Sequence, residues 1–130
     1  MSSKIEQVED LIAWQKVGEL TRATYRATQQ GAFVRDLGLA SRLERAAASM
    51  MSNIAEGFER RGRREFHQFL STAKGSCAEV RSQLYVALDI GYLEKSDFQR
   101  LIAQAEEVGR VLGGLQDSVE KLRDERRSSS

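Results

Sequence analysis

The sequence predicts an all-α protein, an up-down-up-down antiparallel four-helix bundle. Its 130 residues include no proline, the residue that breaks helices most strongly. Apolar residues recur every three or four positions along four segments, which is the period of one helix face. Because the connections between these segments are short, each helix runs antiparallel to the one before it and buries its stripe at a common centre. We expect one domain over residues 1–122 and a flexible, charged and serine-rich tail over residues 123–130.

The first two predicted helices take their limits from a glycine and a capping aspartate. The first helix runs from Asp10 to about Thr28, before the interruption around Gly31. Asp36 can accept a hydrogen bond from a backbone N–H and so begin the second helix, which extends to about Glu59. The apolar stripe of the first helix is Leu11, Trp14, Val17, Leu20 or Thr21, and Tyr25. The stripe of the second helix is Leu39, Leu43, Ala46, Ala47, Met50, Ile54 and Phe58.

The third and fourth predicted helices have their own start and stop residues. Gly62 is the N-cap of the third helix, and Gly91 supplies the left-handed residue at which this helix stops after Ile90. Ser96 followed by Gln99 forms a capping box for the fourth helix. The third stripe is Phe66, Phe69, Leu70, Ala73, Cys77, Val80, Leu84, Ala87 and Leu88. The fourth stripe is Phe98, Leu101, Ile102, Ala105, Val108, Leu112, Leu115, Val119 and Leu122.

The composition argues against an enzyme, a metal protein and a membrane protein. Cys77 is the single cysteine and His67 the single histidine, so the chain has neither an internal disulfide nor a four-ligand zinc site. Cys77 lies on an apolar stripe with no histidine to activate it, which predicts a buried small side chain. The sequence contains no phosphate-binding glycine loop, no nucleophile elbow and no run of about 18 apolar residues. We expect a cytoplasmic protein without catalytic residues, metal, cofactor or membrane anchor.

The charge is nearly balanced overall but uneven along the chain. The formal net charge is +1, which produces no global field that would attract nucleic acid. Residues 35–81 hold nine basic and six acidic side chains, whereas residues 93–125 hold five basic and eight acidic ones. The basic surplus includes the segment SNIAEGFERRGRREF, in which four arginines follow the second helix within five positions.

A polar flank accompanies the apolar stripe of the second predicted helix. At 100° per residue it consists of Arg42, Arg45, Ser49, Ser52, Asn53, Glu56 and Arg60. The first interpretation is ordinary amphipathicity, with Glu56 and Arg60 paired at i, i+4. The second is a subunit interface, in which Ser49 and Ser52 allow close helix approach while Asn53 and Glu56 fix the register.

The third interpretation is a phosphate track for RNA or DNA. Its candidate residues are Arg42, Arg45, Arg60, Arg61, Arg63 and Arg64. Glu56, Glu59 and Glu65 neutralise part of this track, and the nearby Phe58 and Phe66 belong to the core rather than to base stacking. All three interpretations remain open at the level of the residues.

Three segments carry a resemblance to a known family. They are DLIAWQKVGEL (10–20), SNIAEGFERRGRREFHQFLSTAKGS (52–76) and QLYVALDIGYL (83–93). They resemble the four-helix-bundle family of proteins encoded by intervening sequences of bacterial 23S rRNA genes, which is similar to the accessory variability protein of diversity-generating retroelements. The resemblance extends from about Val8 to Leu122. The motif positions are Asp10, Trp14, Asn53, Glu56, Gly57, Arg60, Phe66, Gly75 and Ser76.

The resemblance implies both an assembly and a function. It implies a ring of bundles, with a pentamer the form associated with several members, and binding of nucleic acid and a reverse transcriptase by the retroelement member, without catalysis. This chain departs from the pattern at Gly62, where the family has Ser or Thr, and in its near-neutral charge. For the glycines at 57 and 75 we expect a packing reason, close backbone approach or a helix end.

We therefore predict a non-enzymatic homo-oligomer, a pentamer by resemblance, that acts as a binding or adaptor module. Its expected ligand is structured RNA or a nucleic-acid-processing protein partner, held by the arginines of the second helix and of the junction that follows it. The alternative is a protein-only scaffold, in which the same arginines make intersubunit or solvated ion pairs.

Overall fold

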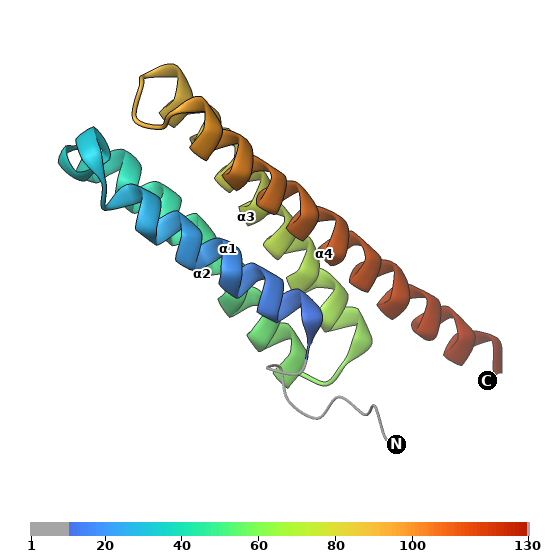
Figure 1. Cartoon of the computed structure of the whole chain (residues 1–130). Helices are drawn as coiled ribbons and strands as arrows, with labels where there is room; N and C mark the ends of the chain where they lie inside the picture. Colours follow the sequence, from blue (N-terminus) through green and yellow to red (C-terminus); the bar gives the residue numbers. More distant parts are fainter. Residues whose placement is uncertain (1–10, 130) are drawn as a thin grey trace.

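The computed structural model describes residues 11–129, with side chains described for residues 11–121, so the predicted helix start at Asp10 lies outside them. The described residues form α1 (Ile12–Thr28), the 3-10 helix η2 (Gly31–Arg35), α2 (Leu37–Glu59), α3 (Arg63–Asp89) and α4 (Lys95–Ser129). Each α-helix runs antiparallel to the next, which confirms the predicted up-down-up-down bundle (Figure 1). Around the bundle, each helix packs against its neighbours in chain order and α4 closes the ring against α1, with the α2–α3 contact the most extensive.

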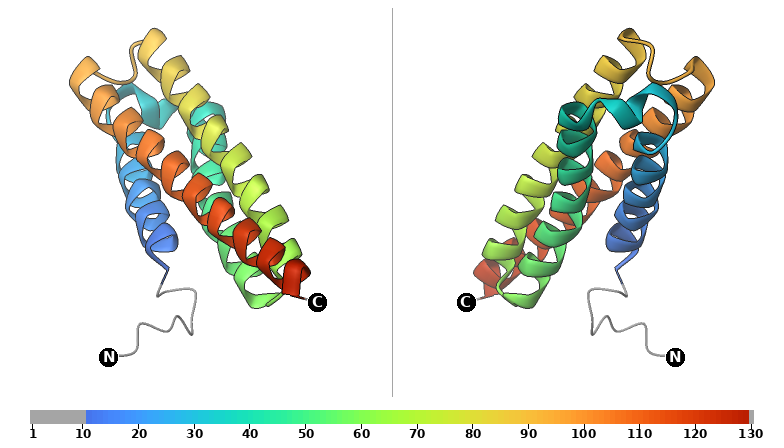
Figure 2. Two further views of the ribbon diagram at one scale, coloured as in Figure 1. Left: turned by 90° about the vertical axis from the view of Figure 1, so that its right-hand side faces the viewer. Right: turned by 90° about the vertical axis from the view of Figure 1, so that its left-hand side faces the viewer.

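The two ends of the bundle carry different connections. The η2 segment and the α3–α4 connection lie together at one end, and the α2–α3 junction lies at the other (Figures 1 and 2). Any site at the α2–α3 junction is therefore separated from the η2 end by the length of α2.

None of the described helices combines the length and the apolar character that a bilayer span requires.

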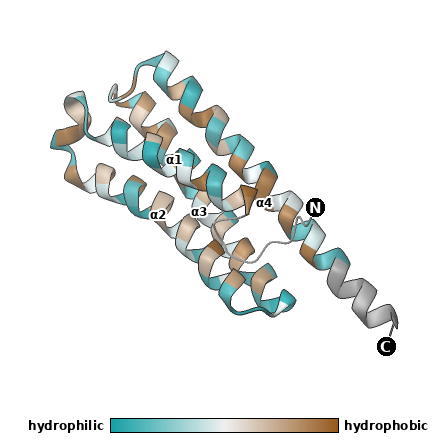
Figure 3. Cartoon of the chain, turned by 60° about the horizontal axis from the view of Figure 1, so that its bottom comes forward, coloured by the Kyte–Doolittle hydropathy of each residue, from teal (hydrophilic) through white to brown (hydrophobic). Residues whose placement is uncertain are grey.

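The core consists mainly of the apolar stripes that the sequence predicts, although Phe69 is not part of it and the side chain of Leu122 lies outside the described residues. Val17, Leu43, Leu70, Leu84 and Leu112 are completely buried, and they come from all four helices. Figure 3 shows hydrophobic segments recurring along each helix, with the α2–α3 junction hydrophilic. The apolar period of three to four residues thus aligns one face of every helix with a common centre.

Two aromatic residues at the η2 end differ from the sequence prediction. Tyr25, expected in the stripe of α1, is 37% exposed, and the neighbouring Thr24 is completely buried instead. Phe33, expected in an interrupting loop, is completely buried because η2 turns it toward the bundle. Its ring lies 5.3 Å from that of Tyr92, centroid to centroid. The loop therefore contributes one of the largest core residues.

The helix ends confirm most of the predicted caps. Asp36 Oδ1 accepts a hydrogen bond from the Leu39 N–H at 3.0 Å, and Gly62 is the extended N-cap of α3. Gly91 has the positive φ of 84° that a left-handed helix stop requires. The predicted capping box at Ser96 is wrong, because α4 begins at Lys95 and Ser96 therefore lies inside the helix. Leu93, just before this helix, is already buried against the core.

Most of the segment expected to be a tail belongs to the last turns of α4. The helix continues without a break through residues 123–129, and Ser130 lies outside the described residues. The predicted flexibility of residues 123–130 stays a prediction.

Candidate functional site

The α2–α3 junction places four arginines on a very short connection. Arg60 is the C-cap of α2, Arg61 adopts a left-handed backbone with φ of 61°, and Gly62 leads into α3 at Arg63. A left-handed residue just after a helix is usually glycine, because a Cβ atom is strained there. The chain therefore holds an arginine in a conformation that costs free energy, between Arg60 at the C-cap of α2 and Arg63 at the start of α3.

Arg60 is held by three interactions. Its Nη2 donates to Glu56 Oε1 at 3.1 Å, and its Nη1 lies 3.5 Å from Glu65 Oε2. Its guanidinium carbon lies 5.5 Å from the centroid of the Phe69 ring, within the range of a cation–π contact. These contacts join the end of α2 to the start of α3, so Arg60 positions the junction. The predicted Glu56–Arg60 pair is confirmed.

Arg61, Arg63 and Arg64 have no ion pair with any residue that the structure describes. Arg61 and Arg64 are exposed and Arg63 is half-buried. Arg63 and Arg64 occupy the first turn of α3, where the helix dipole is positive and cations are unfavourable. The only acidic residue in that first turn is Glu65, which is already paired with Arg60. This part of the junction thus holds three arginines without an ion pair among the described residues, close in sequence to the exposed Glu59.

The two remaining candidate arginines lie elsewhere on α2. Arg42 and Arg45 are exposed in its first half, about 27 Å and 22 Å along the helix axis from Arg60 at 1.5 Å per residue. Arg42 is near enough to Asp36 to help lower the pKa of that carboxyl, after the larger effects of the Leu39 N–H and Tyr92 hydroxyl hydrogen bonds. The structure therefore brings Arg60, Arg61, Arg63 and Arg64 together and leaves Arg42 and Arg45 apart from them.

The predicted polar network separates into two parts. Asn53 Nδ2 donates to the Ser49 carbonyl at 2.8 Å and to Ser49 Oγ at 3.0 Å. The Ser49 hydroxyl lies 3.1 Å from that of Ser76, which joins α2 to α3. Glu56 contacts Arg60 instead, and the exposed Ser52 has no side-chain hydrogen bond within the described part of the chain. Asn53 and Glu56 therefore serve different contacts within the bundle.

Gly57 brings α2 and α3 together beneath the junction. A Cβ atom at this position would lie 2.6 Å from Phe69 Cβ and 3.0 Å from Phe66 Cδ1. The Phe66 ring packs edge-on against that of Phe58, with centroids 6.1 Å apart. Close backbone approach thus explains Gly57, as expected. The same expectation is wrong for Gly75, whose added Cβ would meet no described atom within 4 Å.

The groups that could carry chemistry lie between α3 and α4. Cys77 is buried, as predicted; its thiol donates to the Ala105 carbonyl at 3.2 Å, and burial raises its pKa despite the opposing effect of Arg81. His67 Nε2 lies 3.3 Å from Glu120 Oε2. Within the described residues, no three side chains of the His, Cys, Asp and Glu types lie together as a metal site would need.

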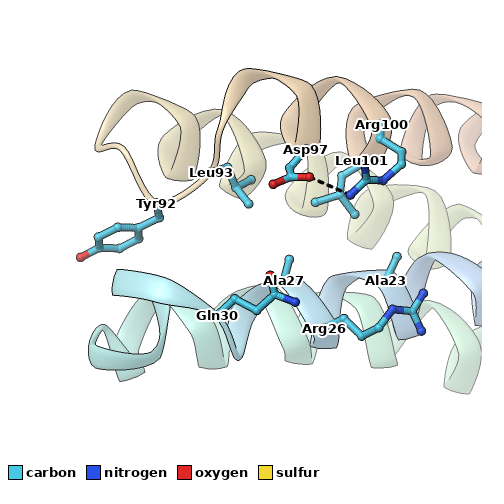
Figure 4. A pocket seen from close by; sticks show the side chains of 9 residues that line it. All are labelled: Ala23, Arg26, Ala27, Gln30, Tyr92, Leu93, Asp97, Arg100 and Leu101. Carbon is cyan, nitrogen blue, oxygen red and sulfur yellow. Dashed lines mark hydrogen bonds and ion pairs between the residues drawn. The ribbon is translucent and has the colours of Figure 1, made fainter.

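A pocket that the sequence does not reveal lies at the η2 end of the bundle. It has a volume of about 200 Å³ and lies between α1 and the start of α4 (Figure 4). Ala23, Ala27 and Leu101 supply apolar walls, while Arg26 and Arg100 contribute guanidinium groups. Arg100 Nη2 donates to Asp97 Oδ1 at 2.8 Å. No local motif could have predicted this pocket, because its walls come from segments about 70 positions apart.

Comparisons with known proteins agree on the fold and on the family. A sequence model described as 23S rRNA-intervening sequence protein matches residues 9–114. A crystal structure of a protein of unknown function from the S23 ribosomal protein family of Bacteroides thetaiotaomicron has the same fold, with a TM-score of 0.74 and 16% identity. That match covers 81% of this chain and 98% of the other. A search of curated proteins found no match.

The family match covers α1, α2, α3 and the whole α2–α3 junction, and it covers α4 as far as residue 114. The resemblance to the accessory variability protein of retroelements stays a prediction. With most of its length matched, the chain belongs to the family of 23S rRNA-intervening sequence proteins.

Proposed function

We propose that this protein is a non-enzymatic binding module that holds the phosphates of structured RNA at its α2–α3 junction. Arg61, Arg63 and Arg64 are the contacting residues, and Arg60 positions them. In this proposal Arg42 and Arg45 contact only a ligand long enough to reach along α2.

The observation that carries this proposal is the group of arginines at the junction that have no ion pair among the described residues. Three arginines without a described ion pair surround the positive end of the α3 dipole, and one of them, Arg61, has a strained left-handed backbone. Positive charge at a helix N-terminus is unfavourable by about 0.3–1 kcal/mol per group at an exposed site. A phosphate bound there would remove this repulsion and accept hydrogen bonds from guanidinium groups. Backbone strain retained at such a position is typical of functional sites.

The test is fluorescence anisotropy of a labelled hairpin RNA at 50 and 200 mM salt. With three phosphate contacts, we expect the affinity of the wild-type protein to fall roughly 20- to 40-fold between these concentrations, from a slope of about −0.7 to −0.9 per contact. The variant Arg61→Ser, Arg63→Ser, Arg64→Ser should lose most of this dependence.

The control variant is Arg26→Ser, Arg35→Ser, Lys95→Ser. It also removes three positive charges, but near the opposite end of the bundle, and should bind the hairpin RNA as tightly as the wild-type protein does. Equal losses in both triple variants would mean that RNA responds only to net charge, and the junction proposal would then be rejected.

We further propose that the chain forms a homo-oligomer, with a ring of five as the expected form. Several large apolar side chains are exposed, among them Leu37 at 76%, Ile12 at 66% and Ile90 at 50%, and burying them between copies would be favourable. Native mass spectrometry measures the number of subunits directly. A monomer at micromolar concentration would contradict this part of the proposal.

The second candidate function is a protein-only scaffold. The pairing of Arg60 with Glu56 and Glu65 favours it, because that arginine already serves the fold. An assembled protein that binds no hairpin RNA at 50 mM salt would make the scaffold the better account.

A further inference from the structure

A basic groove runs along the outside of the bundle between α3 and α4. Its volume is about 450 Å³. Lys74, Cys77 and Arg81 of α3 form one side, and Glu106, Gly109 and Arg110 of α4 form the other. None of these residues belongs to the α2–α3 junction.

The charge in this groove is not balanced. Lys74, Arg81 and Arg110 carry three positive charges and Glu106 one negative charge, so the lining has a net charge of +2. Within the part of the chain that the structure describes, none of the four takes part in an ion pair. Lys74 and Arg81 are seven residues apart, so they lie on the same side of α3, about 10 Å apart along its axis. The groove is thus a row of cations without internal partners.

Gly109 lines this groove, and Gly113 follows it about one turn later on α4, next to Lys74. An added Cβ at Gly109 would come no nearer than 3.9 Å to the Cys77 sulfur, and one at Gly113 no nearer than 3.9 Å to Lys74 Nζ. Both distances are ordinary contacts, unlike the 2.6 Å clash at Gly57. Glycine lowers helix stability relative to alanine. The bundle alone therefore gives no packing reason for glycine at Gly109, and the absent side chain there leaves the groove open to a ligand.

We propose that the α3–α4 groove binds a phosphate-bearing ligand through Lys74, Arg81 and Arg110. A phosphate monoester carries a charge of about −1.5 to −2 near neutral pH, which matches the net charge of the lining, and two successive phosphodiesters carry the same charge. Guanidinium groups bind phosphate oxygens with two parallel hydrogen bonds, and an ammonium group adds a point charge. In this proposal phosphate lies against the backbone of Gly109, where a side chain is absent. This site is independent of RNA binding at the junction.

The test uses two probes, inorganic pyrophosphate and a short oligouridylate with a 5′-hydroxyl end. Each is titrated at low salt into uniformly ¹⁵N-labelled protein. We expect saturable shifts of the Gly109 and Gly113 amide signals, while the signals of Gly18 in α1 and Gly31 in η2, which belong neither to the groove nor to the junction, stay in place. Saturation by pyrophosphate alone identifies a small phosphate compound, and saturation by the oligouridylate identifies a polynucleotide backbone; either supports the proposal.

Two variants test the groove by different means. Lys74→Gln with Arg81→Gln removes charge, and Gly109→Met fills the groove without changing charge; each should weaken probe binding at least tenfold. The matched controls are Arg35→Gln with Lys95→Gln, and Gly114→Met, because an added Cβ at Gly114 meets no described atom within 4 Å. Circular dichroism verifies that every variant is folded.

The proposal is overturned if neither probe shifts the glycine signals at low salt, or if both groove variants bind as tightly as their controls. Its failure is distinguishable from failure at the junction, because the Arg61, Arg63 and Arg64 variant leaves the groove intact and is read with a hairpin RNA.

Discussion

Replacing Gly57 with alanine is expected to separate α2 from α3. The new methyl group would lie 2.6 Å from Phe69 Cβ, an atom fixed to the α3 backbone, so a rotamer change cannot relieve the contact. Overpacking of this kind costs about 1–3 kcal/mol, and the need to move a helix places it near the upper value. Alanine recovers up to about 1 kcal/mol of helix propensity. The net expected loss is about 2 kcal/mol of the free energy of unfolding.

The size of the thermal shift follows from the chain length. At about 2.1 cal/mol/K per residue, 130 residues have an unfolding entropy near 270 cal/mol/K, so a loss of about 2 kcal/mol lowers Tm by about 7 °C. Circular dichroism at 222 nm during heating, together with urea unfolding, measures both quantities.

Gly75→Ala is the matched control for this prediction. Gly75 is exposed in the middle of α3, and an added Cβ would meet no described atom within 4 Å. This substitution should raise the stability by about 0.5–1 kcal/mol through helix propensity alone. A Gly57→Ala protein that melts as high as Gly75→Ala would refute the argument that backbone proximity at Phe69 requires glycine.

The remaining predictions concern a cap, a strained residue, a buried ring and an internal hydrogen bond. The pKa of Asp36 is lowered in the folded state, chiefly by the hydrogen bond from the Leu39 N–H. Its stabilising contribution is therefore complete above its ordinary pKa and is lost as the pH falls below that value. Asp36→Asn should make the free energy of unfolding depend less on pH in this range, as measured by acid unfolding. Arg61→Gly should raise stability by about 1 kcal/mol by removing the left-handed strain and at the same time weaken hairpin RNA binding, and an unchanged affinity would exclude Arg61 as a contact. Phe33→Ala should cost about 3–5 kcal/mol in urea unfolding, and a loss below about 1 kcal/mol would show that η2 does not belong to the folded core. Asn53→Ala should lower the free energy of unfolding by about 1 kcal/mol, measured by melting, or change the number of subunits, measured by native mass spectrometry. Its affinity for hairpin RNA, measured by anisotropy, should stay unchanged.

The clustering of arginines at the junction could be predicted from the sequence, but the role of each arginine could not. The i, i+4 spacing already pairs Glu56 with Arg60, since neighbours on one helix face meet regardless of the rest of the fold. The contact of Arg60 with Phe69, by contrast, depends on how closely α2 and α3 approach. Arg60 can be told apart as a positioning residue from the unpaired Arg61, Arg63 and Arg64 only when the packing of α2 against α3 is known.

Local sequence alone determined the helices of this protein, because a hydrophobic period and a cap act within a few residues of each other. Asp36, Gly62 and Gly91 therefore mark their helix ends as predicted. Only the tertiary structure decided which side chains at the margins of the stripes are buried, since this depends on how each helix is rotated against its neighbours, and it placed Tyr25 partly outside. It also decided the burial of Phe33, which η2 turns from the connection into the core. It also decided where grooves remain between helices, because Lys74 and Arg110 are separated by 36 positions along the chain and meet only where α3 packs against α4.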